Sequence, residues 1–455
     1  MASAEATNDD PTIKSKTEEQ PKTAKPPAPE GSLCGTSVTI DDVRQVLGRH
    51  FGLDSAPELA DWSAVEIGAG KGFLSVLARV KLNWKDASVA AKLPASLISK
   101  IPTTNKLEML FGSDDHNEMM QGMVETLKTQ IHSIHNCEVS VYERFTKPCV
   151  SKPPVKVPAI YGLQRLTDAH SLETGEKAYI FMEDFGGRAA IVEFLKLEYL
   201  NREQLRELVS TLASLHAWSL SEDVSDIECI DIEQMWASML HATEQSQQAF
   251  EKLVHTDDQW KAAIGPELAA KMSKLWLTNE QSAVEFQANM RESGLPTVLC
   301  HGDTHTNNIL FKLDSDGKPT GELAAIIDWQ VKIVPGTVCK APPTVDFVGL
   351  LMWSASCEER TDEFRLELLD FYFETFERSM KAAGKGMPFT VERNYIYSNR
   401  LMIPMMPQFV SQIKTGQIPD VDPEIHGNGL MREARNSIQE TLEMMEKTEK
   451  MKLSD

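Results

Sequence analysis

The chain has 455 residues and a formal net charge of -21, and 42% of its residues are hydrophobic. At about 100–200 residues per domain, this length predicts two or three domains or one large two-lobed unit. The acidic balance argues against a nucleic-acid partner, because phosphate backbones are bound by basic surfaces. No stretch approaches the ~18 consecutive apolar residues of a membrane-spanning helix, and the N-terminus has no apolar core typical of a secretory signal. Seven cysteines without a CxxC pair predict reduced thiols in a cytoplasmic protein.

Residues 1–33 are rich in Pro, Lys, Glu and Ala, as in the segment KTAKPPAPEGS. Such a segment cannot bury enough apolar surface to offset the entropy lost on ordering, so we expect a disordered tail. A smaller, strand-rich lobe is expected at 34–185 and a larger, mainly helical lobe at 186–455. The sequence therefore predicts an α+β fold with two lobes.

The smaller lobe is expected to begin with a short helix that Thr39 or Asp41 caps. Strands follow over 62–93, from WSAVEI to SVAAKLP, on both sides of a glycine cluster. A helix over 116–145 ends in CEVSVYERF, and AYIFMEDF reads as a buried strand at the end of the lobe.

The larger lobe is predicted to be helical except over 298–330. There VLCHGD is a short apolar strand, and NILFKL and GELAAIIDW form a hairpin around the turn pair Asp316-Gly317. Two helices show an apolar stripe at helical spacing. These stripes consist of Leu205, Leu208, Val209, Leu212 and Leu215, and of Leu430, Ala434, Ile438, Leu442 and Met445.

The loop HGDTHTNNIL contains the pattern that carries the most chemistry. Asp303 and Asn308 form D-x-x-x-x-N, the spacing at which protein kinases place a catalytic base and a metal-binding amide. Asp328 ends the apolar run of the hairpin, where a carboxylate is well placed to bind Mg²⁺. We expect His301 to orient the loop backbone rather than to act chemically.

Upstream, IGAGKGF offers three glycines, Gly68, Gly70 and Gly72, between two predicted strands. Glycine permits close approach of the backbone to phosphate oxygens. Lys92 lies about twenty residues on and could bind the α- and β-phosphates if a carboxylate fixes it, for which Glu138 is the candidate. Alone, the glycine cluster also suits an ordinary hairpin turn, and Lys92 also suits a surface lysine on a strand.

The segment after the buried strand, Met182, Glu183 and Asp184, could bind the edge of adenine through its backbone groups. In chain order, the glycines, the lysine, the adenine segment, the catalytic loop and the second aspartate are the parts of an ATP- and Mg²⁺-dependent phosphotransferase.

At these residues the chain resembles the superfamily of aminoglycoside phosphotransferases and choline kinases. More closely, it is similar to the CHK kinase-like group, which includes ecdysteroid-kinase-like proteins and nematode relatives. The resemblance implies a protein-kinase-like fold and transfer of the ATP γ-phosphoryl to the hydroxyl of a small molecule. It also implies that Asp346, in PPTVDFVGLL, braces the catalytic loop. Gly302 replaces the arginine of the protein-kinase HRD motif, which argues against a protein substrate.

Several other residues have two readings. His132 and His135, with Cys137, suit a helix surface better than a metal site, because no second ligand pair follows. His305 suits a solvent-facing loop position better than a substrate contact. Met352 and Trp353 suit a substrate wall and a packed core equally.

Two further classes of function remain open. One is a catalytically silent protein that keeps the kinase fold and binds a ligand or partner, since fold does not guarantee activity. The other is a regulatory protein that uses the tail as a binding arm. The acceptor is not specified by the sequence, although steroid, glycoside and xenobiotic alcohols are favoured. The oligomeric state is equally unspecified.

Overall fold

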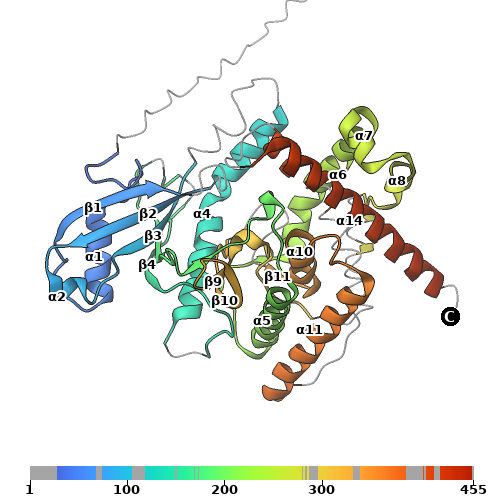
Figure 1. Cartoon of the computed structure of the whole chain (residues 1–455). Coiled ribbons are helices and arrows are strands. Elements are labelled where there is room, and N and C mark those ends of the chain that lie inside the picture. Colours follow the sequence, from blue (N-terminus) through green and yellow to red (C-terminus); the bar gives the residue numbers. More distant parts are fainter. Residues whose placement is uncertain are drawn as a thin grey trace, which may run out of the picture.

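The computed structural model describes residues 28–452 except for short internal gaps. The gaps are 68–73, 105–117, 149–150, 169, 173, 279, 282–283, 286–295, 331–338, 386–402, 404–405 and 415–420. The chain forms a smaller lobe built on a β-sheet and a larger helical lobe beside it (Figure 1). The α+β, two-lobed architecture expected from the sequence is confirmed.

The smaller lobe is built on a five-stranded antiparallel sheet with the order β1-β2-β3-β5-β4. Its strands are β1 (Leu59–Glu66), β2 (Ser75–Trp84), β3 (Ser96–Pro102), β4 (Ile160–Gln164) and β5 (Tyr179–Glu183). Side chains of a strand point alternately to the two faces of its sheet. In β3, Leu97 and Ile101 therefore pack in the core of the smaller lobe, while Ile98 and Lys100 face the larger lobe.

Helix α1 (Ile40–His50) packs on the sheet face that points away from the larger lobe. It starts with a capping box in which Thr39 and Asp42 satisfy each other's backbone N–H groups, so Thr39 is the N-cap. The helix approaches β4 so closely that a Cβ at Gly162 would lie 2.3 Å from Cγ1 of Val46. Leu33 is fully buried in the same core. Ordered packing thus already includes the last residue of the predicted tail, and residues 1–27 lie outside the described part.

The predicted strand SVAAKLP is wrong. Asp86 accepts hydrogen bonds from the N–H groups of Ser88 and Val89 and starts the short helix α2 (Ala87–Ala90). The chain then turns, and the next strand begins only at Ser96. This shift by a few residues changes which lysine lies in the sheet.

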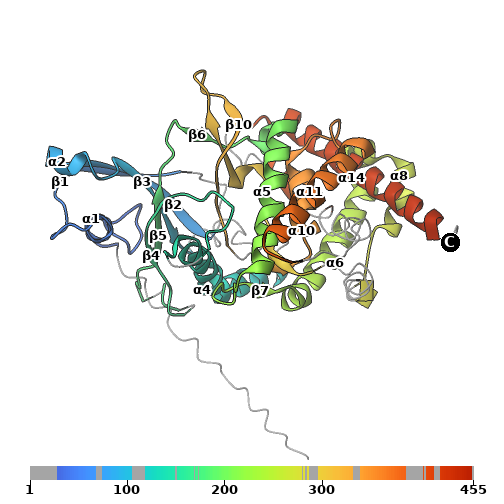
Figure 2. The same ribbon diagram turned by 90° about the horizontal axis from the view of Figure 1, so that it is seen from below.

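Helix α4 (Glu118–Thr146) runs between the sheet and the larger lobe, and Figure 2 shows it beside β4 and β5. The lobe-connecting segment after β5 holds β6 (Ala189–Ala190) and the 3-10 helix η1 (Phe194–Lys196). The larger lobe then contains mainly helices. They are α5 (Arg202–Ser221), α6 (Ile232–Thr256), α7 (Asp258–Ile264), α8 (Pro266–Lys271), η2 (Met272–Lys274), α10 (Thr344–Ser354), α11 (Asp362–Ala382), α13 (Met406–Lys414) and α14 (Pro423–Lys452).

Two small sheets are set into the larger lobe. Strands β9 (Ile309–Leu313) and β10 (Pro319–Ile326) form the expected antiparallel hairpin, and β6 pairs with β9. The other sheet joins β7 (Ile230–Asp231), β11 (Cys339–Ala341) and β8 (Val298–Cys300). A loop with the 3-10 helix η3 (Thr306–Asn308) links β8 to β9.

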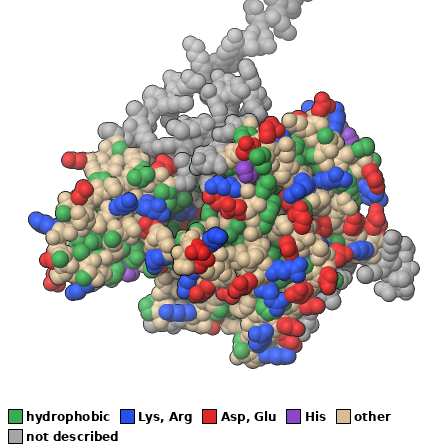
Figure 3. Space-filling view, in the orientation of Figure 1, with side chains coloured by type: hydrophobic (Ala, Val, Ile, Leu, Met, Phe, Trp, Pro, Cys, Tyr) green, Lys and Arg blue, Asp and Glu red, His purple; other side chains and the backbone are tan. Residues whose placement is uncertain are grey.

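The surface of the larger lobe carries intermixed positive and negative side chains on the face shown in Figure 3. Among the described residues, no helix is both long and apolar enough to cross a bilayer. The predicted apolar stripe of α5 is buried in the main core, and that of α14 is buried as far as Leu442.

Leu33 provides a test of where the folded chain begins. Leu33→Ala should lower the free energy of unfolding by about 3 kcal/mol, because it removes buried methyl groups and leaves a cavity. Ile425→Ala, at a helix position that is 65% exposed, is the control and should change it little. Urea unfolding of both variants measures the difference, and equal midpoints would show that Leu33 does not belong to the core.

His135, on α4, provides a test of pH dependence. Its side chain is buried and its Nε2 lies 2.8 Å from the carbonyl oxygen of Gln164. Burial lowers the pKa of His135 from 6.5 to about 4. The unfolded chain therefore binds more protons between these values, so stability is complete above pH 6.5 and falls as the pH drops toward 4. The loss from pH 8 to pH 5 should be about 2 kcal/mol.

His135→Gln keeps a side-chain N–H donor and does not titrate, so it should remove this part of the pH dependence. His255→Gln, at an exposed position in α6, should leave the dependence as in the wild type. Urea unfolding across this pH range checks both variants. If His135→Gln and the wild type show the same slope, the assignment of the pH dependence to His135 is wrong.

Candidate active site

The loop between β8 and β9 is held by one buried carboxylate, that of Asp346 in α10. Asp346 accepts the backbone N–H groups of His301 at 2.8 Å and Gly302 at 2.7 Å. Its backbone carbonyl accepts the hydroxyl of Thr304 at 2.8 Å. His216 Nε2 lies 3.0 Å from the same carboxylate. The bracing role that the family resemblance implied for Asp346 is thus visible as three hydrogen bonds to the loop, with a fourth from His216 in α5.

His216 extends this support to α11. Its Nδ1 lies 2.8 Å from the hydroxyl of Tyr372, and both side chains are buried. The carboxylate of Asp346 only accepts, so the Nε2–H of His216 donates to it and Nδ1 accepts the phenol O–H of Tyr372. The sequence did not predict this contact, because no local pattern links residues 216, 346 and 372.

His301 orients the loop, as expected. Its Nδ1 accepts the N–H of Asp303 at 3.2 Å, and its Nε2–H donates to the carbonyl oxygen of Ile327 at 3.0 Å. Burial lowers the pKa of His301, although the nearby carboxylates oppose this, and a neutral ring fits both bonds. The next residue, Gly302, has a φ of 75°, a conformation that favours glycine. An arginine at this position would be strained.

Asn308 links Asp303 to the segment that precedes Asp328. Its Nδ2 donates to the carbonyl oxygen of Asp303 at 2.9 Å and to Oδ2 of Asp303 at 3.1 Å. Because the amide nitrogen bonds to Asp303, the amide oxygen is the atom of Asn308 that could bind a cation. The Asn308 carbonyl accepts the N–H of Ile327 at 2.9 Å, which places Asp328 next to the loop.

Asp328 adopts a left-handed backbone conformation with a φ of 67°, which is uncommon for a residue other than glycine. One carboxylate oxygen bonds to the ammonium of Lys100, and the other accepts Nε2 of Gln330 at 3.2 Å. Strained residues concentrate at functional sites, where surrounding contacts hold them. Asn308 contacts both Asp303 and the residue before Asp328, so these three residues lie together, as the sequence predicted.

The lysine of the site is Lys100 in β3, and the predicted pairing of Lys92 with Glu138 is wrong. Lys100 Nζ lies 2.6 Å from Oε2 of Glu138 on α4 and also bonds to Asp328. Lys92 is exposed in the turn after α2. The run SLISKIP, with apolar residues around its lysine, was the available strand signal that sequence reasoning passed over. A lysine on the third strand paired with a glutamate on the following helix is the arrangement seen in protein kinases.

Lys100 is held as a charged group. Only 7% of its side chain and 1% of the Glu138 side chain are exposed. Burial by itself lowers the pKa of Lys100, but the carboxylates of Asp328 and Glu138 more than offset this and the pKa is raised. Removing either carboxylate would leave a buried charge less well compensated.

Aromatic side chains fix the helix that carries Glu138. Tyr142, one turn after Glu138, is fully buried, and burial together with the charges of Glu138 and Asp328 raises its pKa well above the usual value. Trp329 follows Asp328 and packs edge-on against His301, at 4.6 Å between ring centroids, and against Phe145, at 5.1 Å. These rings connect α4 with the loop between β8 and β9.

The other predicted positions are the adenine segment at 182–184 and the glycine cluster. Met182 is buried in β5 beside Ile98, and Glu183 ends that strand with its N–H bonded to the carbonyl of Ala159 at 2.8 Å. Asp184 follows the strand, and its carboxylate bonds to Arg79. Gly68, Gly70 and Gly72 lie outside the described residues.

The structure also locates the residues for which the sequence allowed two interpretations. His135 and Cys137 are buried, so the helix-surface interpretation is wrong for them. His305 is partly buried in the loop, where its Nδ1 accepts the N–H of Asn307 at 3.2 Å. Met352 and Trp353 belong to the main core, and Trp353 packs against Phe194.

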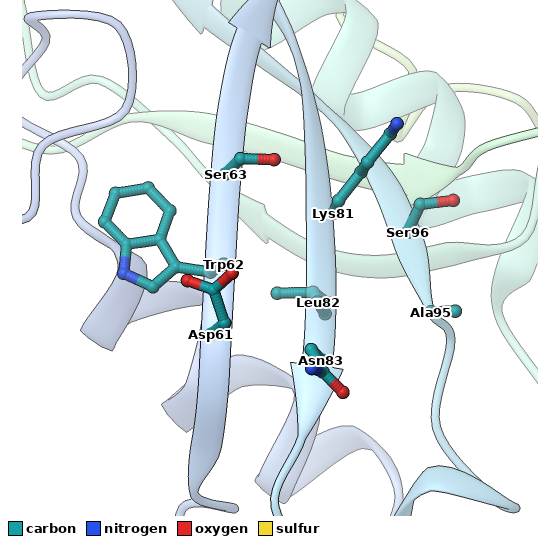
Figure 4. A pocket seen from close by; sticks show the side chains of 8 residues that line it. All are labelled: Asp61, Trp62, Ser63, Lys81, Leu82, Asn83, Ala95 and Ser96. Carbon is teal, nitrogen blue, oxygen red and sulfur yellow. The ribbon is translucent and has the colours of Figure 1, made fainter.

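A hollow on the smaller lobe lies apart from these residues. It is lined by residues of β1, β2 and the start of β3, including Ser63, Lys81 and Ser96 (Figure 4). Lys81 and Ser96 project to the same side there, away from Trp62. Lys100, Glu138 and Asp328 are not among the residues that line this hollow.

The chain is similar to one curated protein and to several solved structures. A Caenorhabditis elegans protein named uncharacterized kinase-like protein D1044.1 is 23% identical over 322 residues, 70% of this chain and 74% of the relative. Two solved structures are similar at low identity. Spectinomycin phosphotransferase APH(9)-Ia, in complex with ADP and spectinomycin, is 13% identical with a TM-score of 0.42, covering 90% of this chain and 99% of its own. Choline kinase from Cryptosporidium parvum is 10% identical with a TM-score of 0.41, covering 86% and 90%.

The profile of the DUF1679 family, described as uncharacterized oxidoreductase dhs-27, matches residues 28–452. This match spans nearly the whole chain. The protein therefore belongs to the DUF1679 family.

Proposed function

We propose that this protein is an ATP-dependent kinase that transfers the γ-phosphoryl group to an alcohol hydroxyl of a small molecule. The observation that carries the proposal is the position of Lys100, buried between Glu138 and Asp328. Phosphoryl transfer needs a cation on the α- and β-phosphates and a carboxylate that holds this cation in place. Lys100 and Glu138 fit these two roles, and Asp328 lies on the other side of the lysine.

The side-chain oxygens of Asp328 and Asn308 suit a magnesium ion. Mg²⁺ prefers hard oxygen ligands, which the carboxylate of Asp328 and the amide oxygen of Asn308 provide. The bond from the Lys100 ammonium to Asp328 supports this fit, because it indicates that the carboxylate faces a position where positive charge is stabilised. When bound, the ion would neutralise charge on the phosphates.

Asp303 is proposed as the catalytic base. The bonds from Asn308 hold one of its carboxylate oxygens and its backbone carbonyl, while 15% of its side chain stays exposed. In the proposed step the alcohol oxygen forms a bond to the γ-phosphorus as the bond from that phosphorus to the β-bridging oxygen breaks. ADP leaves with the electron pair, and the alcohol proton passes to Asp303.

The acceptor class is proposed to be a steroid, glycoside or xenobiotic alcohol, with the protein acting in the cytoplasm. The word oxidoreductase in the family description names another chemistry. An oxidoreductase activity is less well supported by this site. A buried lysine, carboxylates and an amide suit the binding of metal and phosphate rather than the transfer of hydride. Glycine-loop residues Gly68, Gly70 and Gly72 stay proposed as the phosphate cover.

Replacing Lys100 provides the sharpest test. Lys100→Met should lower kcat/KM for phosphorylation of an alcohol by about 10²–10³-fold, because it removes a preorganised positive charge from the phosphates. Lys92→Met removes the same type of side chain from the exposed turn and should leave kcat/KM close to wild type. Assays with γ-labelled ATP against a library of alcohols measure both variants, with Asp303→Asn as the blank.

Each other outcome has a definite meaning. Equal losses in the two lysine variants would contradict the assignment of Lys100. If the wild type binds Mg-ATP but phosphorylates no alcohol above the Asp303→Asn blank, the chain is a silent ligand-binding protein. Absence of Mg-ATP binding by the wild type, with turnover of a nicotinamide cofactor, would support the oxidoreductase class.

A further inference from the structure

The sheet face that carries Lys100 also carries an arginine. Arg79, in β2, lies opposite Ile98 in β3, and Ile98 lies opposite Met182 in β5. Because Ile98 precedes Lys100 by two residues, both point to the same face. Arg79, Ile98 and Met182 therefore form one row across this face, next to the row of Lys100.

The guanidinium of Arg79 crosses β3 to reach the segment between the lobes. Its Nε donates to Oδ2 of Asp184 at 2.9 Å and its Nη2 donates to Oδ1 at 3.2 Å. This two-point contact fixes the plane of the guanidinium as well as its position. Asp184 is well anchored, since 5% of its side chain is exposed and it also accepts the N–H of Gly186 at 3.1 Å.

The Arg79 side chain keeps 40% of its surface exposed, although its guanidinium is bonded to Asp184. It thus presents a flat, positively charged group above Ile98. Along a strand each residue advances about 3.3 Å, so this row lies roughly 7 Å from Lys100 toward the connection between the lobes. If Lys100 binds the α- and β-phosphates, the base of the nucleotide extends in this direction.

We propose that Arg79, fixed by Asp184, is a nucleotide-binding residue on which the base stacks. The inference rests on the proposed function, because it requires a nucleotide whose phosphates meet Lys100. A guanidinium plane stacks well on aromatic faces, and stacking accepts any base because every base has a π-face. Arg79 accordingly contributes to binding of the base rather than of the phosphates.

The test compares the binding of Mg-ADP and of inorganic tripolyphosphate to the full chain by calorimetry. Arg79→Ala should weaken Mg-ADP binding by about 10-fold and leave tripolyphosphate binding unchanged. Lys81→Ala is the charge-matched control, because Lys81 is exposed on the same face of the same strand, one row further out. It should change neither affinity. Arg79→Lys keeps the charge without the plane and should show most of the Arg79→Ala loss.

The outcomes separate this inference from the proposed function. If the wild type binds Mg-ADP and Arg79→Ala binds it equally well or more tightly, Arg79 is not the stacking surface, whereas the proposed function stands. Equal losses of Mg-ADP and tripolyphosphate would show a charge effect on phosphate and would also overturn the inference. If the wild type binds no nucleotide, both proposals fail. A single cooperative thermal transition of Arg79→Ala confirms that the variant is folded.

Discussion

The site depends on one buried ammonium group. Lys100 comes from the sheet of the smaller lobe, Glu138 from α4 and Asp328 from the hairpin of the larger lobe. Burying charge costs free energy, and a buried ion pair seldom stabilises a fold more than apolar packing would. An ammonium between two carboxylates at the junction of three elements is therefore better explained by function than by stability.

Apolar packing sets the positions at which these charges meet. Trp329 follows Asp328, and its ring contacts His301 in the loop between β8 and β9 and Phe145 in α4. A rotation of α4 would thus move Glu138 and disturb the packing behind Asp328 together. The loop itself is fixed from the opposite side by Asp346, whose carboxylate holds two consecutive backbone N–H groups. Aromatic contacts and a buried carboxylate together preorganise the site.

The parts of the site that sequence alone predicted are those set by local geometry. Asp303 and Asn308 lie five residues apart on one loop, and Asp328 ends a hairpin with a clear turn, so short-range spacing brings them together. The choice of lysine depends instead on which segment pairs with β2 and β5, which is a long-range property. A capping contact from Asp86 made a helix of the segment that precedes Lys92. The link from Tyr372 through His216 to Asp346 is likewise non-local.

The charges of the site argue that a cation must accompany any phosphate ligand. Asp303, Glu138 and Asp328 carry three negative charges when ionised, and Lys100 carries one positive charge, which leaves the cluster at −2. The whole chain is also acidic, with a formal net charge of -21. A polyphosphate would meet net repulsion here at short range, where screening by salt is weakest. Arg79 adds positive charge only at the outer row, where Asp184 already neutralises it. A divalent ion bound by Asp328 and Asn308 would offset this charge and release Lys100 to face the phosphates, which is why metal and nucleotide are expected to bind together.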